Sequence, residues 1–180
     1  MKFRKMLLLG CGALLLTGCG DKEVTNGNGD EPKSYTNKFE CVRSDNTSKY
    51  MIEKRYGKRY DSLEEEREAS KNSEVGVSGE IRKIYDFNKS GDKLLHYYEI
   101  ATYKYLVDVD MSREEENYKD GCDKSSDYGY INCKVSVDGK TITVTKEADL
   151  DGDYNKEEAA KMTLESIKND YSESDTYTCE

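Results

Sequence analysis

The sequence predicts an α+β fold: one small domain with an antiparallel β-sheet built from hairpins, and two or three short helices, one of them C-terminal. Three observations lead to this prediction. Two long segments alternate apolar with polar residues around a turn sequence, charged segments with helix-capping residues flank them, and no repeating βαβ pattern occurs. The folded domain is expected to span residues 35–180, a length that suits a single domain.

The first hairpin is expected between residues 79 and 107. Ile81, Tyr85 and Phe87 share one face at a period of two residues. Residues 88–92 read Asn-Lys-Ser-Gly-Asp, which is typical of a turn. Residues 94–107 continue with β-branched and aromatic side chains, so the two halves form a long hairpin.

A second hairpin is expected over residues 131–145. Apolar and polar residues alternate from Ile131 to Val137, Asp138-Gly139 makes the tight turn, and residues 142–144 return on the second strand. Three shorter strands are expected elsewhere, at residues 35–41, 48–56 and 176–180. In the first of them, Tyr35, Phe39 and Cys41 lie on one face.

Helix starts are indicated at three places where serine or asparagine stands three residues before glutamate. The pairs are Ser62–Glu65, Ser112–Glu115 and Asn155–Glu158. The first segment, residues 61–72, has little to pack and fits either a short helix or a solvated loop. The second is expected to end at Gly121. Apolar residues at helical spacing follow the third: Ala160, Leu164, Ile167 and Tyr171.

Residues 1–18 have the order of a secretory signal peptide. Lys2, Arg4 and Lys5 precede an apolar run from residue 6 to residue 16, which is about half the ~20 residues needed to cross a bilayer. Leu-Thr-Gly-Cys, residues 16–19, resembles the lipobox of bacterial lipoproteins. The resemblance implies cleavage before Cys19 and a diacylglyceryl group, with fatty chains such as palmitate, on the Cys19 sulfur. The alternative is an ordinary cleaved signal followed by a chance cysteine.

A lipid on Cys19 would anchor the chain to the extracytoplasmic face of the cell membrane, because two acyl chains hold far longer than one. Residues 19–34 are rich in glycine, asparagine and charge and contain the only proline, so they are expected to be a flexible linker. The expected organisation is therefore signal peptide 1–18, lipidated N-terminus and linker 19–34, and α+β domain 35–180.

The charge of the chain limits its partners. The formal charge is −9, and removal of the three basic residues in 1–18 lowers it to −12. Phosphate backbones would be repelled, which excludes nucleic acid as a partner. A second, polybasic contact with the membrane is excluded for the same reason.

Four of the six cysteines remain for the folded domain once Cys11 leaves with the signal and Cys19 takes the lipid. An even number in an exported domain indicates two disulfides, and spacing does not choose among the three pairings. We favour Cys122–Cys133, which closes a short loop, and Cys41–Cys179, which joins the first and last strands. A zinc site is disfavoured because the chain has no C-x-x-C pair and a single histidine. With fifteen Tyr, three Phe and no Trp, the core is modest and benefits from covalent links.

Asp149, Asp151 and Asp153 match positions 1, 3 and 5 of an EF-hand calcium loop. The glycine required at position 6 is Tyr154, and the glutamate required at position 12 is Ala160. The simpler interpretation is an acidic turn that favours the N-terminus of the following helix. We therefore assign no metal to this segment.

The remaining candidates for chemistry are one histidine and a row of tyrosines. His96 is the only histidine and lies mid-strand, without an oriented nucleophile. Tyr97, Tyr98, Tyr103 and Tyr105 either form a stacking surface for sugars or peptides or fill a thin core. No phosphate-binding or dinucleotide-binding glycine motif is present, so no cofactor is assigned.

Three segments in order carry a second resemblance: FNKSGDKLL (87–95), MSREEENYKD (111–120) and TITVTKEADLD (141–151), followed by a terminal helix. This order resembles the small YehR-like bacterial lipoproteins over residues 87–171. The resemblance implies a lipid anchor and an α+β domain without an established activity, and no site residues carry over from it. The cysteine pairs depart from the pattern of that family.

Two functions fit these features. The first is a membrane-anchored, non-catalytic binding or envelope-associated module whose protein or glycan ligand is unidentified. The alternative is a surface hydrolase that uses paired carboxylates and depends on calcium. The first rests on the anchor, the linker, the small domain and the absence of a catalytic motif.

Overall fold

The structure is a computed structural model of the chain, and it describes residues 37–180. The expected signal peptide 1–18, the linker 19–34 with Cys19, and Tyr35 lie outside the described residues. Within residues 37–180, no helix combines the length and apolar character that crossing a bilayer would require.

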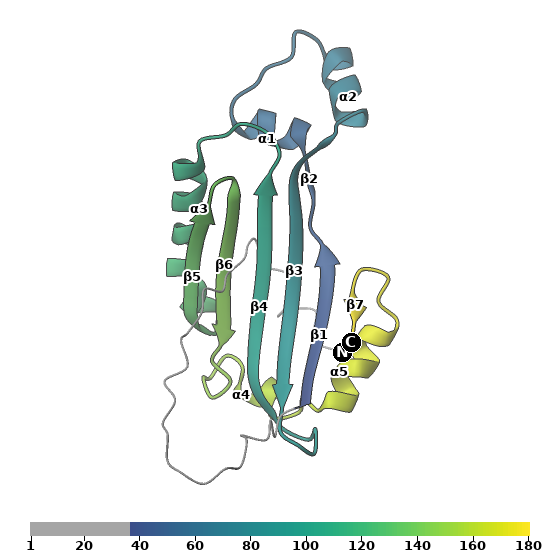
Figure 1. The fold of residues 1–180 in the computed structure, drawn as a ribbon, viewed down its shortest axis with the longest axis vertical. Helices are drawn as coiled ribbons and strands as arrows, with labels where there is room; N and C mark the ends of the chain where they lie inside the picture. Colours follow the sequence, from purple (N-terminus) through teal and green to yellow (C-terminus); the bar gives the residue numbers. More distant parts are fainter. Residues whose placement is uncertain (1–36) are drawn as a thin grey trace, which may run out of the picture.

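The described chain forms one antiparallel sheet with helices around it, so the α+β prediction is confirmed (Figure 1). The strand order is β5-β6-β4-β3-β1-β7, and β2 pairs with β3. The strands are β1 (Asn37–Ser44), β2 (Thr47–Ser48), β3 (Val75–Phe87), β4 (Leu94–Tyr105), β5 (Tyr130–Asp138), β6 (Thr141–Ala148) and β7 (Thr178–Cys179). The helices are α1 (Lys49–Arg55), α2 (Leu63–Lys71), α3 (Met111–Asp123), α4 (Lys156–Ala159) and α5 (Leu164–Ser172), with a 3₁₀ turn η2 (Ser125–Tyr128) after α3.

Both predicted hairpins are present, β3–β4 and β5–β6. In the first turn the Asn88 side-chain oxygen accepts hydrogen bonds from the backbone N–H groups of Asp92 and Lys93. In the second turn Gly139 takes a φ of 55°, a left-handed conformation that favours glycine. The expected short strands at the two ends of the domain also form, and they pair with each other as β1 and β7.

The strand expected over residues 48–56 is wrong. The chain extends only over Thr47–Ser48 and then turns into α1, where the Ser48 hydroxyl accepts a hydrogen bond from the Met51 backbone N–H. Serine is a strong N-cap residue, and Ile52 is the only buried side chain of this helix. A single buried position does not distinguish the two-residue period of a strand from the period of a helix. The apolar pattern of this segment therefore could not decide between them.

Two predicted helices form with shifted boundaries. α2 begins after Ser62, whose side chain accepts the Glu65 N–H as expected, so the segment is a helix and not a loop. α3 begins after Asp110 instead of Ser112, because the Asp110 carboxylate accepts the N–H groups of residues 112 and 113. It also continues past Gly121, where it was expected to stop, and ends at Asp123.

The C-terminal segment forms two helices, α4 and α5, where one was expected: Leu164, Ile167 and Tyr171 lie in α5, and Ala160 is the C-cap of α4. Asn155 does not cap α4 with its side chain, which instead donates to the carbonyls of Gly129 (2.7 Å) and Asp149 (3.0 Å). A capping box between Thr163 and Ser166 starts α5 afresh. The local capping bonds therefore override the continuous periodicity.

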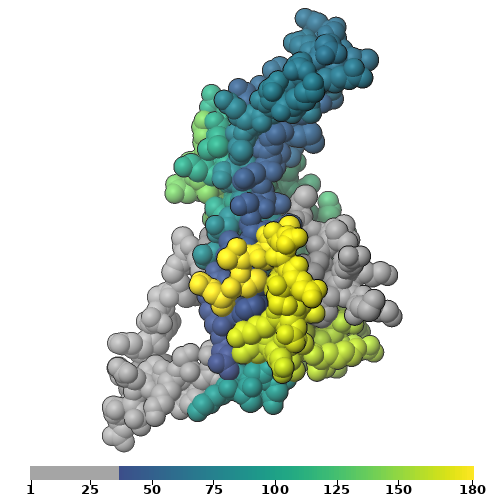
Figure 2. All heavy atoms as spheres, turned by 90° about the vertical axis from the view of Figure 1, so that its right-hand side faces the viewer, coloured from purple at the N-terminus to yellow at the C-terminus, as the bar shows by residue number. Residues whose placement is uncertain are grey.

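Helices α1, α3 and α5 and the C-terminal segment cover one face of the sheet, and this face holds two separate hydrophobic clusters. The upper cluster packs against α1 and α3, and the lower cluster packs against α5 and β7 (Figure 1). Figure 2 shows the C-terminal segment seated against β1 at the sheet edge. The opposite face carries polar side chains that are exposed or half-exposed, among them Arg82, Thr102, Lys104 and Thr143.

Two disulfides join Cys41 to Cys179 and Cys122 to Cys133, which are the pairs that the sequence analysis favours. The first ties β7 to β1 across a sequence separation of 138 residues. The second ties the end of α3 to β5 across 11 residues. The first disulfide therefore holds β7 to its neighbouring strand, and the second holds the end of α3 to the strand at the other edge of the sheet.

We predict that the two disulfides contribute unequally to stability. Loop-closure entropy gives about 5 kcal/mol for the long loop and about 3 kcal/mol for the short one. Guanidinium unfolding of the double variants Cys41→Ser/Cys179→Ser and Cys122→Ser/Cys133→Ser should therefore show the larger loss for the first pair. Equal losses, or a larger loss for the second pair, would contradict the entropic account.

Candidate functional site

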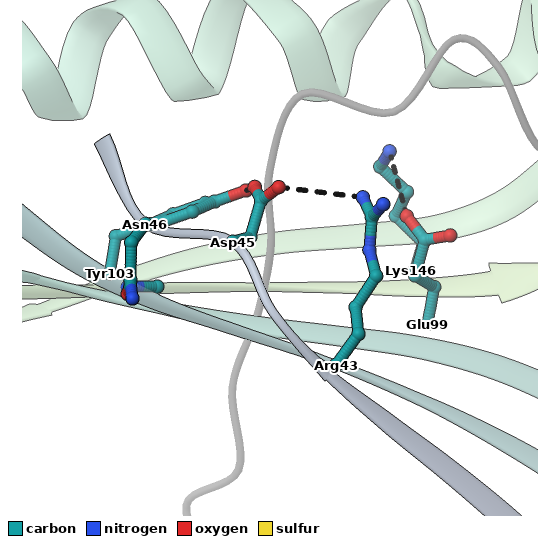
Figure 3. Close-up of polar contacts among 7 residues, drawn as sticks. Arg43, Asp45, Asn46, Glu99, Tyr103 and Lys146 are labelled. Atoms are coloured by element: carbon teal, nitrogen blue, oxygen red, sulfur yellow. Dashed lines mark hydrogen bonds and ion pairs between the residues drawn. The ribbon is translucent and has the colours of Figure 1, made fainter. Parts of the chain in front are cut away.

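A row of charged side chains crosses the middle of the covered sheet face. Lys83 of β3 lies opposite Glu99 of β4, and Glu99 lies opposite Lys146 of β6. Arg43 of β1 is on the same face. It is in register with Ile81, the inward-facing residue that precedes Lys83 on β3. We call Arg43, Lys83, Glu99 and Lys146 the charged row. Figure 3 shows the labelled members Arg43, Glu99 and Lys146 rising from the same side of the sheet.

The register places the charged row between the two hydrophobic clusters. On the same face, the next inward-facing residues belong to the upper cluster on one side of the row: Ile81, Ala101 and Val144. On the other side, Tyr85 and Tyr97 belong to the lower cluster. The row also ends at a disulfide on each side. Cys41 is in register with Lys83, and Cys133 is in register with Lys146. The charged row therefore crosses the sheet between the two disulfides.

Three members of the charged row are buried. Lys83 is 3% exposed, and Glu99 and Lys146 are each 7% exposed. The Lys146 ammonium pairs with the Glu99 carboxylate at 3.6 Å. Removing charges from water costs several kcal/mol per ion unless geometry and hydrogen bonds compensate, so this row works against the stability of the fold.

Arg43 occupies the more open end of the row, with its side chain 32% exposed. Its Nη2 lies 3.5 Å from Asp45 Oδ1, and the Tyr103 hydroxyl donates to Asp45 Oδ2 at 2.6 Å (Figure 3). Gly79 permits this arrangement, because a Cβ there would lie 2.2 Å from the Asp45 carbonyl oxygen and 2.7 Å from the Tyr103 ring. The Arg43 Nε–H is buried and has no acceptor among the described residues.

Lys83 is the unmatched member of the row. Within residues 37–180 its ammonium has no hydrogen-bond acceptor and no ion pair, and its nearest marked contact is the Tyr177 ring, with Nζ 5.3 Å from the centroid. Burial lowers the pKa of Lys83 to about 8; Glu99 opposes this shift, and Arg43 and Lys146 add to it. The three cations of the row face two carboxylates, Glu99 and Asp45, so one positive charge is in excess.

Two tyrosines flank the cations of the row. The Tyr177 ring lies 5.5 Å from the Arg43 guanidinium carbon and 5.3 Å from Lys83 Nζ. The Tyr130 ring lies 5.1 Å from Lys146 Nζ. Burial raises the pKa of both phenols, so they stay neutral. Such cation–π contacts offset part of the desolvation of the cations without supplying an acceptor.

A second buried charge, Glu114, has its partners in place. This carboxylate is 1% exposed and accepts hydrogen bonds from the Tyr56 hydroxyl at 2.8 Å, from the Tyr105 hydroxyl and from Arg55 Nη1 at 3.2 Å. It thereby fastens α3 to α1 and β4. Tyr105, which binds Glu114, is six residues from Glu99 on β4, a separation of roughly 20 Å along the strand. The two buried carboxylates are therefore held at different levels of the sheet, and each lies against its own cation.

A surface pocket of about 430 Å³ lies between α1 and the segment that follows β4. Its lining mixes apolar residues such as Ile52 and Val107 with charged ones. Lys140 is paired with Asp108, and Glu53 is paired with Lys58. The remaining cation of the lining, Lys49, is exposed to solvent, so its charge does not carry the desolvation cost of Lys83.

The acidic turn considered for calcium is held by its own backbone. The Asp149 carboxylate accepts hydrogen bonds from the N–H groups of Asp151 (3.3 Å) and Gly152 (3.0 Å). No cluster of three or more metal-ligating side chains occurs among residues 37–180. These bonds close the turn itself and do not reach α4, which begins at Lys156 without a side-chain cap.

The histidine and tyrosine candidates separate between the two faces. His96 lies on the open face, stacks on Tyr98 and has Nδ1 3.5 Å from Glu147 Oε1. Tyr97, Tyr103 and Tyr105 are buried in the two clusters. Most of the tyrosine row therefore fills the core instead of forming a stacking surface.

The charged row was not predicted from the sequence. The signal that could have found it is a charged residue at an inward position: Lys83 falls between Ile81 and Tyr85, and Glu99 falls between Tyr97 and Ala101. Comparisons of the chain with protein-family models, characterised proteins and solved structures give no match. The resemblance to YehR-like lipoproteins therefore stays a prediction.

We predict that Lys83→Met stabilises the protein by about 1–3 kcal/mol at pH 7, because an apolar side chain of similar length removes an unmatched buried charge. The gain should shrink as the pH rises through 8. There the folded chain releases the Lys83 proton while the unfolded chain keeps it up to a pKa near 10.5, so wild-type stability rises with pH. Urea unfolding between pH 6.5 and 9.5 measures both effects. Lys104→Met on the open face is the matched control, and a loss of stability in Lys83→Met would contradict the prediction.

For Glu114 we predict the opposite sign. Glu114→Leu should cost about 3–5 kcal/mol, because it leaves Arg55 and two phenols without their acceptor. Thermal or urea unfolding measures the loss, and Glu116→Leu on the exposed side of α3 should change stability by less than about 0.5 kcal/mol. Similar effects of the two substitutions would show that the buried network contributes little.

Proposed function

We propose that this chain is a lipid-tethered, non-catalytic binding module of the cell envelope, and that its charged row receives the ligand. The observation that carries the binding proposal is Lys83, a residue that is 3% exposed and whose ammonium has no hydrogen-bond acceptor or ion pair within residues 37–180. Proteins rarely bury an unmatched charge without a use for it, because the cost to stability is high.

The envelope location is supported by two independent features. Residues 1–19 combine a positive start, a short apolar run and a lipobox-like end at Cys19. Two disulfides hold the folded domain, and disulfides persist in oxidising compartments outside the cytoplasm. With a diacylglyceryl anchor and a linker of residues 19–34, the domain would stand off the membrane surface.

The hydrolase alternative has less support. It needs two carboxylates that face one substrate, with one of them able to hold a proton. Among the described residues the two buried carboxylates are Glu99 and Glu114, and each already lies against a cation. The binding module is therefore the function we put forward.

We predict that Cys19→Ser abolishes lipid labelling and releases the chain from the membrane fraction, because the thioether needs the Cys19 sulfur. Growth with an alkyne-bearing palmitate analogue, followed by membrane fractionation, measures both effects. Cys11→Ser is the matched control, since it changes a cysteine of the signal that carries no lipid, and it should label like the wild type. An unlabelled wild-type chain would contradict the proposed anchor.

A further inference from the structure

We propose that the charged row is a binding site for the carboxylate of a small organic monoanion, seated between Arg43 and Lys83 and against the Tyr177 ring. This deepens the proposed function, because it names the ligand class of the same site. It rests on the proposal that the domain is a binding module.

The first argument is the chemistry of the unmatched groups. Arg43 Nε–H and the Lys83 ammonium are both hydrogen-bond donors, and neither has an acceptor among residues 37–180. A site that presents only donors is complemented by a ligand that only accepts, which is the character of a carboxylate or another oxyanion. Water or a neutral ligand would leave the charge uncompensated.

The second argument is that the two donors converge. Arg43 and Lys83 sit on adjacent strands at diagonal positions of one face, opposite Ile81 and Cys41 respectively. Such diagonal neighbours have Cα atoms about 7–8 Å apart, so the two long side chains rise next to each other on the face. Both cations also lie within 5.5 Å of the same Tyr177 ring. One acceptor group can therefore reach both.

The charge of the site favours a ligand with a single negative charge. The row and Asp45 together carry one positive charge in excess, which a monoanion neutralises and a phosphate dianion would reverse. The Tyr177 ring beside Arg43 and Lys83 gives the site one aromatic wall, which favours an organic body beside the charged group. Both features favour a carboxylate over an inorganic phosphate or sulfate.

The entrance is at the β1 edge. Arg43 and Asp45 have side chains 32% and 36% exposed, whereas Lys83 is buried deeper in the row. The chain as a whole carries a formal charge of −9, so its long-range field does not attract anions. Binding must therefore depend on the local donors, and single substitutions in the row should have large effects.

The experiment is an NMR titration of the oxidised chain from residue 19 onward, carrying Cys19→Ser, with sodium benzoate and sodium acetate as probes. We expect saturable shifts in the amides around residues 43, 83 and 177, with benzoate binding more tightly than acetate. Lys83→Met should weaken benzoate binding at least tenfold, while Lys104→Met on the open face should leave it unchanged. Arg43→Gln is the second variant, and it should also weaken binding.

Glu99→Gln provides an independent test with the opposite sign. It keeps the shape of the side chain and removes the competing negative charge, so benzoate should bind more tightly than in the wild type. Weaker binding by this variant, an unchanged affinity in Lys83→Met, or saturable binding of phosphate in place of both carboxylates would overturn the proposal. No saturable response to any anion would overturn the site alone, because the Cys19 labelling experiment tests the lipid-tethered location separately.

Discussion

The rest of the structure depends on one constraint: the covered face of the sheet is interrupted by charge. Lys83, Glu99 and Lys146 are in register across β3, β4 and β6, so the apolar surface of the face cannot be continuous. The core accordingly divides into two clusters, each with its own cover. Ile52 and Ile167, from α1 and α5, are the helix residues buried in the upper and lower clusters. Each cluster is small, which limits the apolar area that each helix can bury.

The two disulfides offset this division of the core, and each lies at one end of the charged row. Cys41 and Cys133 occupy the register positions next to Lys83 and Lys146, so a covalent bond closes the face at each end of the charged row. Cys179 brings β7 and its neighbour Tyr177 over Arg43 and Lys83. Cys122 holds the end of α3 against β5. The same bonds that offset a thin core therefore also position an aromatic side chain of the candidate site.

The sequence could predict those parts of the fold that depend on local chemistry. Turn residues mark both hairpins: the Asn88 side chain accepts backbone N–H groups of the first turn, and Gly139 takes the positive φ that the second turn requires. The prediction failed where caps decide, at Ser48 and at Thr163, since a cap can end one period and begin another within a residue. The charged row could not be assembled from one sequence. Its members are far apart along the chain, and only the strand register brings Lys83, Glu99 and Lys146 into line.

A charged row inside a sheet could also serve to fix the strand register, since a slip of one residue would move Lys83 and Glu99 to the open face. That role needs opposite charges that satisfy each other, as Lys146 and Glu99 do. It does not need a third cation without an acceptor, because a methionine at position 83 would specify the same face at a lower cost. Register therefore accounts for the Glu99–Lys146 pair and leaves Lys83 and the Arg43 Nε–H unexplained. An acceptor from beyond residues 37–180, such as a bound carboxylate, accounts for both, and for that reason we prefer binding to a purely structural role for this part of the row.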